Sequence, residues 1–174
     1  MASFEAIKKD RNPANHPAHV LTKLFDRNSI DTPKQFVNLE QYLHPSLDTA
    51  AHWIEFSIMR LKLASECVLS RHGNEVIARH IELIRLADIV VLLYAMLATA
   101  SRASRSYCIG LQHGDHEIHL ANTFCKDASE TIRRLAKDLE KGQYNTNDSE
   151  YDTLARHLFR EKKYSFQHPL TKNF

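Results

Sequence analysis

Glycine occurs only four times in this chain of 174 residues, and each glycine stands where a helix would end or turn. The four are Gly73, Gly110, Gly114 and Gly142. Glycine destabilises a helix interior by roughly 0.5–1 kcal/mol relative to alanine and is favoured just past a helix end. The long intervals between these glycines therefore predict an all-α fold. We expect an antiparallel bundle of about four main helices, preceded by one or two short N-terminal helices.

Three long helices are predicted from apolar residues that recur at alternating spacings of three and four. They cover approximately residues 46–72, 74–110 and 115–142, with Asn74 and Asp115 as the N-caps of the second and third. The expected inner faces are Leu47, Ala51, Ile54, Ile58, Leu61, Ser65 and Val68; then Ile77, Ile81, Ile84, Val91, Ala95 and Ala98; then Ile118, Ala121, Cys125, Ala128, Ile132, Leu135 and Leu139.

The second helix is expected to lie at the centre of the bundle, because residues 89–98 form an uninterrupted apolar run. Ten residues are too few to span a bilayer as a helix, which takes about 20. The run therefore predicts a core helix that is contacted on every side. On this hypothesis Val91→Asp would be severely destabilising, because it would bury an unpaired charge.

Polar residues 145–148 precede a predicted fourth helix, which uses Tyr151, Leu154, Ala155 and Leu158 as its inner face. Pro169 is expected to end the ordered chain. We predict a helical bundle over residues 44–174, a single domain overall with the N-terminal segment 1–43.

The N-terminal segment has the pattern of a partner-docking region. Residues 17–27 can form a short helix, and Thr32 with Pro33 can start another. An apolar stripe on short helices suits docking into a partner's groove, and packing back onto the bundle is an equally weighted alternative. The residues proposed for partner binding are Val20, Leu21, Leu24, Phe25, Phe36, Val37, Leu39, Tyr42 and Leu43.

Charge and motif content argue against several functions. With 23 basic and 21 acidic residues the formal charge is +2, which provides no general attraction to nucleic acid. The three cysteines are odd in number and widely spaced, which favours reduced thiols. The chain has no glycine-rich phosphate loop and no GxSxG elbow. We therefore predict no catalytic, cofactor-binding or metal-binding residue in this chain.

The richest metal-like cluster consists of His113, His116 and His119, with Asp115 and Glu117 beside them. Three imidazoles could bind zinc, but only two of them share a helix face, and neither an HExxH pattern nor a cysteine pair accompanies them. A polar helix start is the preferred interpretation, because carboxylates there are stabilised by the helix dipole.

Four charged residues of the second helix are predicted to form structural ion pairs. Asp88 falls on the expected inner face, where Arg85 or an arginine of a neighbouring helix could pair with it. A catalytic carboxylate is the alternative. Arg102 and Arg105 stand in the last turns, where positive side chains are favourable. An anion site built on these two guanidinium groups is the alternative there.

Several short motifs together resemble the C-terminal helical domain of acyl-CoA dehydrogenase family member 9, which is related to the very-long-chain acyl-CoA dehydrogenase. The motifs are LYAM (93–96), SRASRS (101–106), IGL (109–111), DHE (115–117) and LANTFC (120–125). RLAD (85–88) and LYAM look more like the very-long-chain enzyme. IGL, DHE and LANTFC, with the closing HPL (168–170), look more like family member 9.

The resemblance implies a non-catalytic second helical bundle that supports a homodimer. It implies that FAD and the catalytic glutamate belong to a preceding dehydrogenase core in the full-length parent, and that the parent lies in the mitochondrial matrix at the inner membrane. In the family member 9 branch it also implies a partner, the complex I assembly factor called evolutionarily conserved signalling intermediate in Toll pathways.

A membrane-association domain of a very-long-chain fatty acyl-CoA dehydrogenase is the alternative function. Residues 16–43 bear on it, because Lys23, Arg27 and Lys34 are balanced there by Asp26, Asp31 and Glu40. Attraction to anionic lipid is about 1 kcal/mol per basic residue near the surface, and acidic residues oppose it. This balance argues against membrane binding through the N-terminal segment.

Overall fold

The computed structural model describes residues 37–142, 146–163, 166 and 170, and all regular secondary structure among them is helical. In chain order the elements are η2 (Leu39–Gln41), η3 (Pro45–Leu47), α3 (Asp48–His72), η4 (Gly73–Ala78), α4 (His80–Cys108), α5 (Gly114–Lys141) and α6 (Asp148–Glu161). The predicted all-α fold is confirmed. The chain divides into two compact units, Met1–Glu140 and Lys141–Phe174. The predicted boundary at residue 44 remains a prediction.

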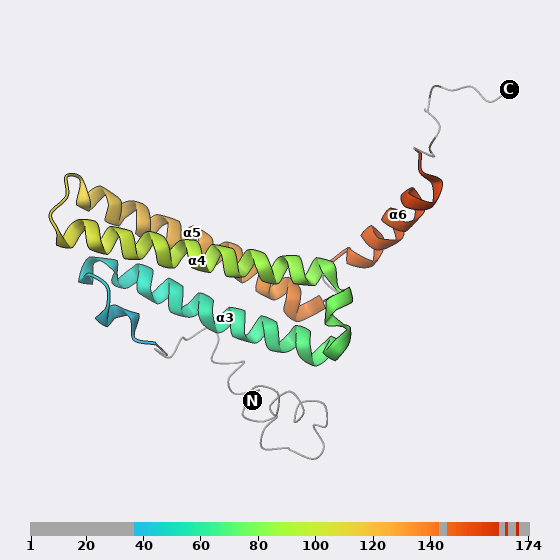
Figure 1. Cartoon of the computed structure of the whole chain (residues 1–174), viewed down its shortest axis with the longest axis horizontal. Helices are drawn as coiled ribbons and strands as arrows, with labels where there is room; N and C mark the ends of the chain where they lie inside the picture. Colours follow the sequence, from blue (N-terminus) through green and yellow to red (C-terminus); the bar gives the residue numbers. More distant parts are fainter. Residues whose placement is uncertain (1–36, 143–145, 164–165, 167–169, 171–174) are drawn as a thin grey trace, which may run out of the picture. The chain divides into compact units, whose positions relative to one another are not determined.

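Helices α3, α4 and α5 form the bundle of the first unit, each antiparallel to the next (Figure 1). Gly73, with φ of 55°, ends α3, and the short 3-10 helix η4 carries the chain into α4. The second long helix therefore begins at His80, and the prediction that Asn74 caps it is wrong. A tight turn with positive φ at Gly110 and His113 connects α4 to α5, which begins at Gly114 rather than after a cap at Asp115.

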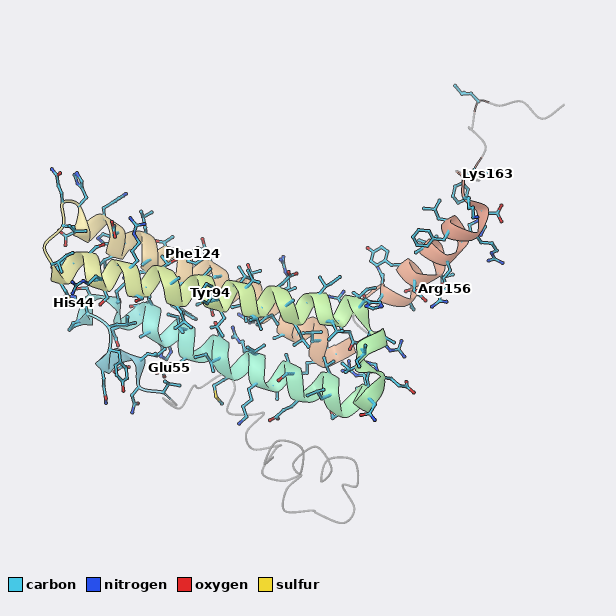
Figure 2. All side chains as sticks on the ribbon, in the orientation of Figure 1. His44, Glu55, Tyr94, Phe124, Arg156 and Lys163 are labelled. Carbon is cyan, nitrogen blue, oxygen red and sulfur yellow. The ribbon has the colours of Figure 1, made fainter. Side chains whose placement is uncertain are left out.

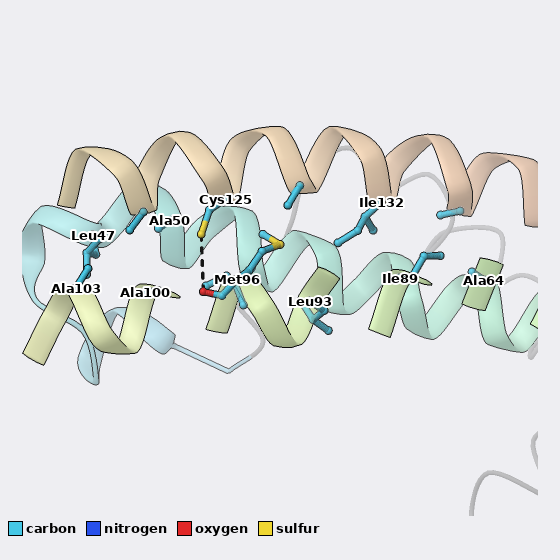
Figure 3. Close-up of a cluster of buried hydrophobic side chains, with 14 of the residues drawn as sticks. Leu47, Ala50, Ala64, Ile89, Leu93, Met96, Ala100, Ala103, Cys125 and Ile132 are labelled. Carbon is cyan, nitrogen blue, oxygen red and sulfur yellow. Dashed lines mark hydrogen bonds between the residues drawn. The ribbon is translucent and has the colours of Figure 1, made fainter. Parts of the chain in front are cut away.

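The core of the bundle contains apolar side chains from all three helices (Figure 3). The predicted inner face of α5 is confirmed, since Ile118, Ala121, Cys125, Ile132 and Leu139 are buried. α3 contributes Ala50, Ile54, Ala64 and Val68, with Leu47 just before it, and α4 contributes Ile89, Leu93, Met96, Ala100 and Ala103.

The predicted inner face of the second helix is wrong. Ile77 in η4 and Ile81, Ile84, Val91 and Ala98 in α4 are exposed. The helix is covered by α3 and α5 along one side, so it is not surrounded by neighbours. Because residues 89–98 are apolar all round, the spacing of apolar residues could not indicate which side would be buried.

Among the described residues, α4 is the one helix long and apolar enough to cross a membrane by length and composition. Its best 18-residue window has a mean hydropathy of 2.0, and 22% of that window is buried. A ten-residue run was therefore too narrow a criterion for excluding this helix. Ile89, Leu93 and Met96 nevertheless belong to the bundle core. Any membrane contact of the folded bundle would use the opposite side of α4.

Helix α6 lies in the second unit. It begins at Asp148, at the end of the polar stretch that was predicted to precede the fourth helix. An ion pair between Arg156 Nε and Asp152 Oδ2 at 2.7 Å lies on its surface. Within this unit Tyr151, Leu154 and Leu158 are exposed, so they do not form a buried face there. An amphipathic pattern shows that a helix has an apolar face, but it does not show which surface covers that face. Pro169 lies outside the described residues.

Candidate docking surfaces

The side of α4 that faces away from the core is apolar and exposed; we call it the α4 outer face. Val91 is 65% exposed and Tyr94, labelled in Figure 2, is 73% exposed. Other exposed apolar side chains along this helix include Ile81, Ile84, Val90 and Leu97, with Ala87 and Ala98 among them. Contiguous apolar patches of this kind usually mark a surface that binds another molecule.

Charged residues flank this face. Asp88 is exposed, so the premise that its carboxylate is buried is wrong. Arg102 and Arg105 are exposed as well, and Arg102 Nη2 lies 3.7 Å from Glu117 Oε1 on α5. Exposed ion pairs of this kind contribute at most about 1 kcal/mol. Arg85 is half-buried and has an interaction of its own. Arg102 thus pairs with Glu117 of α5, and not with Asp88.

The N-terminal residues proposed for partner binding divide into three groups. Tyr42 is 77% exposed, and Val37 is exposed too. Leu39 and Leu43 pack against the bundle core, and the Leu39 backbone N–H donates to Glu55 Oε1 at 2.8 Å. Leu39 and Leu43 therefore pack back on the bundle, as the alternative prediction had it. Val20, Leu21, Leu24, Phe25 and Phe36 lie outside the described residues.

Helix α6 carries a second apolar surface within its own unit, which we call the α6 face. It consists of Tyr151, Leu154, Ala155, Leu158 and Phe159, and all but the half-buried Ala155 are exposed. The spacing of three, one, three and one places these side chains on one side of the helix. Arg156, labelled in Figure 2, and Arg160 lie on its polar side. This pattern is typical of a helix that inserts into a groove of a partner.

The three histidines of the 113–119 segment are exposed. His113 lies in the turn, while His116 and His119 lie in the first turns of α5. In the part of the chain that the structure describes, no three histidine, cysteine or acidic side chains are grouped closely enough to hold a metal ion. Asp115 and Glu117 occupy the first turn of α5, where the helix dipole favours carboxylates.

A charged cluster that was not predicted from the sequence lies where the three bundle helices meet. Glu82 near the start of α4 is buried, and its carboxylate oxygens lie 2.9 Å from His72 Nε2 and 3.5 Å from Arg71 Nη1. Arg71 Nη2 donates to the backbone carbonyls of Leu139 and Glu140, at 3.0 and 2.9 Å. The arginine is thus bound at the C-terminal end of α5, where a positive charge is favourable.

A sequence signal for Glu82 did exist. Glu82, Ile89, Met96 and Ala103 recur at intervals of seven, and all four are buried. That register would have placed Glu82 on the inner face of α4 in place of Asp88.

A hollow of about 360 Å³ lies beside the start of α3 and is lined by Glu40, His44, Pro45 and Asp48. His44 Nδ1 accepts a hydrogen bond from the Ser46 backbone N–H at 3.3 Å, and its ring contacts that of Tyr107. The two carboxylates would repel the pyrophosphate of a flavin dinucleotide. The residues here therefore do not fit FAD.

Burial distinguishes Cys125 from the exposed Cys108. Cys125 lies in the core, its Sγ donates weakly to the Met96 carbonyl at 3.9 Å (Figure 3), and burial raises the pKa of its thiol from 9.0 to about 11. The unfolded chain therefore loses this proton at lower pH than the folded chain does. The stability that Cys125 contributes should be fully present below pH 9 and should be lost as the pH rises toward 11.

We expect Cys125→Ala to lessen the fall in the urea midpoint between pH 9 and pH 11. Cys108→Ala is the matched control and should retain the wild-type slope, because that thiol is exposed in the folded chain. Equal slopes for all three proteins would contradict the burial of the Cys125 thiol.

Comparison with known proteins confirms the resemblance noted in the sequence. Residues 45–164, well over half of the chain, match the family model described as ACAD9/ACADV, C-terminal domain. The chain is 30% identical over 104 residues to the mitochondrial very long-chain specific acyl-CoA dehydrogenase of Rattus norvegicus, covering 60% of this chain and 16% of that protein. The Homo sapiens protein of the same name is 32% identical over 97 residues, covering 56% of this chain and 15% of its own length.

The Bos taurus protein of that name is 31% identical over 127 residues, which cover 73% of this chain and 18% of that protein. The chain therefore spans less than a fifth of the length of these curated relatives. The matched residues 45–164 take in the whole three-helix bundle and all of α6. This chain belongs to the ACAD9/ACADV C-terminal domain family.

Proposed function

We propose that this chain is a non-catalytic docking domain of a mitochondrial protein resembling acyl-CoA dehydrogenase family member 9. In that role it supports the homodimer of the parent protein and binds a complex I assembly factor. The observation that carries the proposal is the pair of exposed apolar surfaces, the α4 outer face and the α6 face, on a domain whose core is complete without them. Such surfaces gain stability by contact with another molecule.

The parent protein is proposed to be an FAD-dependent acyl-CoA dehydrogenase of fatty acid oxidation. The relatives are named as mitochondrial very long-chain specific acyl-CoA dehydrogenases, which supports this assignment and a mitochondrial location. The flavin is proposed to bind a part of the parent outside this chain, and the hollow at Glu40 and Asp48 does not fit it. Association of the parent with the matrix side of the inner membrane is part of the same proposal.

The partner of the α6 face is proposed to be the assembly factor called evolutionarily conserved signalling intermediate in Toll pathways. Tyr151, Leu154, Leu158 and Phe159 would enter an apolar groove on it. The exposed side chains of Val37 and Tyr42 are the described part of a second candidate surface for this partner.

The test is titration calorimetry of the 174-residue chain with the purified assembly factor. Leu154→Glu combined with Leu158→Glu places two carboxylates on the α6 face and should weaken binding at least about tenfold. Arg160→Glu, on the opposite side of α6, is the matched control and should bind normally. The melting temperature of the bundle should be unchanged in both variants, because these side chains are exposed.

Normal binding by the α6 variant together with weakened binding by Val37→Glu, Tyr42→Glu would move the site to the N-terminal segment. No binding of the wild-type chain at all would contradict the assembly-factor role.

Membrane association is the second candidate function, and the mean hydropathy of 2.0 in α4 favours it. The α4 outer face could lie on a lipid surface while Ile89 and Met96 keep their place in the core. Flotation with cardiolipin-containing vesicles tests this candidate. Binding of the wild-type chain that Val91→Glu abolishes would support it, and chain that stays unbound at low salt would exclude it.

A further inference from the structure

Helix α3 carries a second apolar stripe, on the side that faces away from the bundle core. We call it the α3 outer stripe, and it consists of Phe56, Met59, Leu63 and Cys67. Spacings of three, four and four residues place these side chains in one line along the helix. Helices α4 and α5 lie on the other side of α3, and the described core cluster contains none of the four residues (Figure 1).

The α3 outer stripe is shielded although the core does not reach it. Phe56 is only 7% exposed, and the other three side chains are half-buried. Arg60 beside the stripe is buried as well. Its guanidinium carbon lies 3.6 Å from the centre of the Phe56 ring, its Nη1 donates to the Ser129 carbonyl at 3.2 Å, and the side chain has a further interaction of its own. An apolar stripe on the side of a helix away from the core is stabilised when another apolar segment packs on it.

The described chain begins at Val37, close to the start of the stripe. The Leu39 backbone N–H donates to Glu55 Oε1 at 2.8 Å, and Glu55, labelled in Figure 2, immediately precedes Phe56. The residues before Val37 therefore join the bundle next to the stripe. They also belong to the same compact unit as the bundle, Met1–Glu140.

The segment from residue 17 to residue 27 matches the stripe in pattern and in length. Four apolar residues would share one side of the short helix predicted there: Val20, Leu21, Leu24 and Phe25. Eleven helical residues are about 16 Å long, and the stripe from Phe56 to Cys67 extends over about the same length. Residues 28–38 can span roughly 36 Å when extended, so the segment can reach the whole stripe.

We infer that the α3 outer stripe binds the chain's own N-terminal segment, with residues 17–27 packed as a short helix along α3. The apolar side chains of the segment and of the stripe then bury one another, which supplies the attraction. The contact is autoinhibitory for any partner that uses Leu24 or Phe25. Such a partner has to displace the segment from α3 first, and this lowers its apparent affinity.

Alkylation of the three cysteines with iodoacetamide, followed by mass spectrometry, tests the inference on the full 174-residue chain. Cys67 lies within the stripe, while the exposed Cys108 and the buried Cys125 report any general change in the fold. Leu21→Glu combined with Leu24→Glu places two carboxylates on the apolar side of the segment. The labelling rate of Cys67 should then rise at least about tenfold, and the rates of the other two cysteines should not change.

His19→Glu combined with Thr22→Glu is the matched control. It adds two carboxylates at the same spacing on the opposite side of the predicted short helix. Cys67 of this variant should be labelled at the wild-type rate.

Trypsin cleavage after Lys23 reports on the segment itself. Leu63→Glu in the stripe should accelerate this cleavage at least about tenfold, because the segment is released from α3. Val91→Glu places the same charge on the α4 outer face and should leave the cleavage rate unchanged.

Equal labelling rates for Cys67 and Cys108 in the wild-type chain would overturn the inference, because the stripe would then be open. Equal Cys67 rates in the wild type and in the Leu21→Glu, Leu24→Glu variant would also overturn it, since something else would cover the stripe. Protection of Cys67 that is lost on dilution would assign the stripe to a second copy instead. Protection that appears only with added assembly factor would assign it to that partner, and release of the segment by Val91→Glu in place of Leu63→Glu would place the segment on α4.

Discussion

Replacing Ile89 with aspartate is expected to unfold most of the protein, whereas the same replacement at Val91 should leave the bundle folded. Ile89 is completely buried between the three helices, and an aspartate there would be a buried charge without a partner. Substitutions of this kind cost about 4 kcal/mol or more, which is a large part of the stability of a small domain. Val91 is 65% exposed, so its carboxylate would remain in water.

The measurement is urea unfolding followed by circular dichroism, at the same low protein concentration for every variant. Ile89→Ala is the graded control and should lose about 2–5 kcal/mol, through a cavity and without a charge. Val91→Asp should stay within about 0.5 kcal/mol of the wild type. If Val91→Asp unfolded the chain and Ile89→Asp did not, the face assigned to the core would be wrong.

The contrast between α4 and α5 shows how much of the fold the sequence could predict. In α5, charged residues such as Lys126, Asp127 and Glu130 separate the apolar positions, so the 3.6-residue period has one buried solution and the prediction was right. In α4, apolar residues surround the helix between residues 89 and 98, and both sides satisfy the pattern. The packing of α3 and α5 then decides which side of α4 is buried. The pattern of residues within α4 gives no information about that packing.

A pattern within one helix does not show which side is buried, and this also explains the outcome at Asp88 and at the apolar face of α6. Asp88 was assigned to the interior because it shares a register with Val91 and Ala95, and it is exposed because that register forms the outer face. The existence and the start of α6 were correctly predicted, because a polar stretch precedes its amphipathic pattern. An apolar face on a short helix predicts that some surface covers it, and the identity of that surface lies outside the pattern.

Removing the Glu82 carboxylate is expected to be the most destabilising change at a charged residue of the bundle. Glu82→Ala would leave His72 and Arg71 without their shared anion at the junction of three helices. Breaking a fully buried ion pair typically costs about 3–5 kcal/mol, because the remaining charge has lost its partner. The Arg71 side chain is 33% exposed, so water reduces that cost here. Arg71 keeps its bonds to the Leu139 and Glu140 carbonyls, so we expect the lower end of that range, about 3 kcal/mol.

Urea unfolding of Glu82→Ala beside Glu75→Ala separates this effect from a general loss of charge. Glu75 is an exposed carboxylate in η4, so its removal should change the unfolding free energy by less than about 0.5 kcal/mol. Glu82→Gln keeps the shape and one acceptor oxygen, and its loss should lie between those of the two alanine variants. Because the Glu82 side chain is buried while that of Arg71 is 33% exposed, raising the salt concentration should reduce the difference only in part. Equal stability of Glu82→Ala and Glu75→Ala would show that the cluster does not hold the three helix ends together.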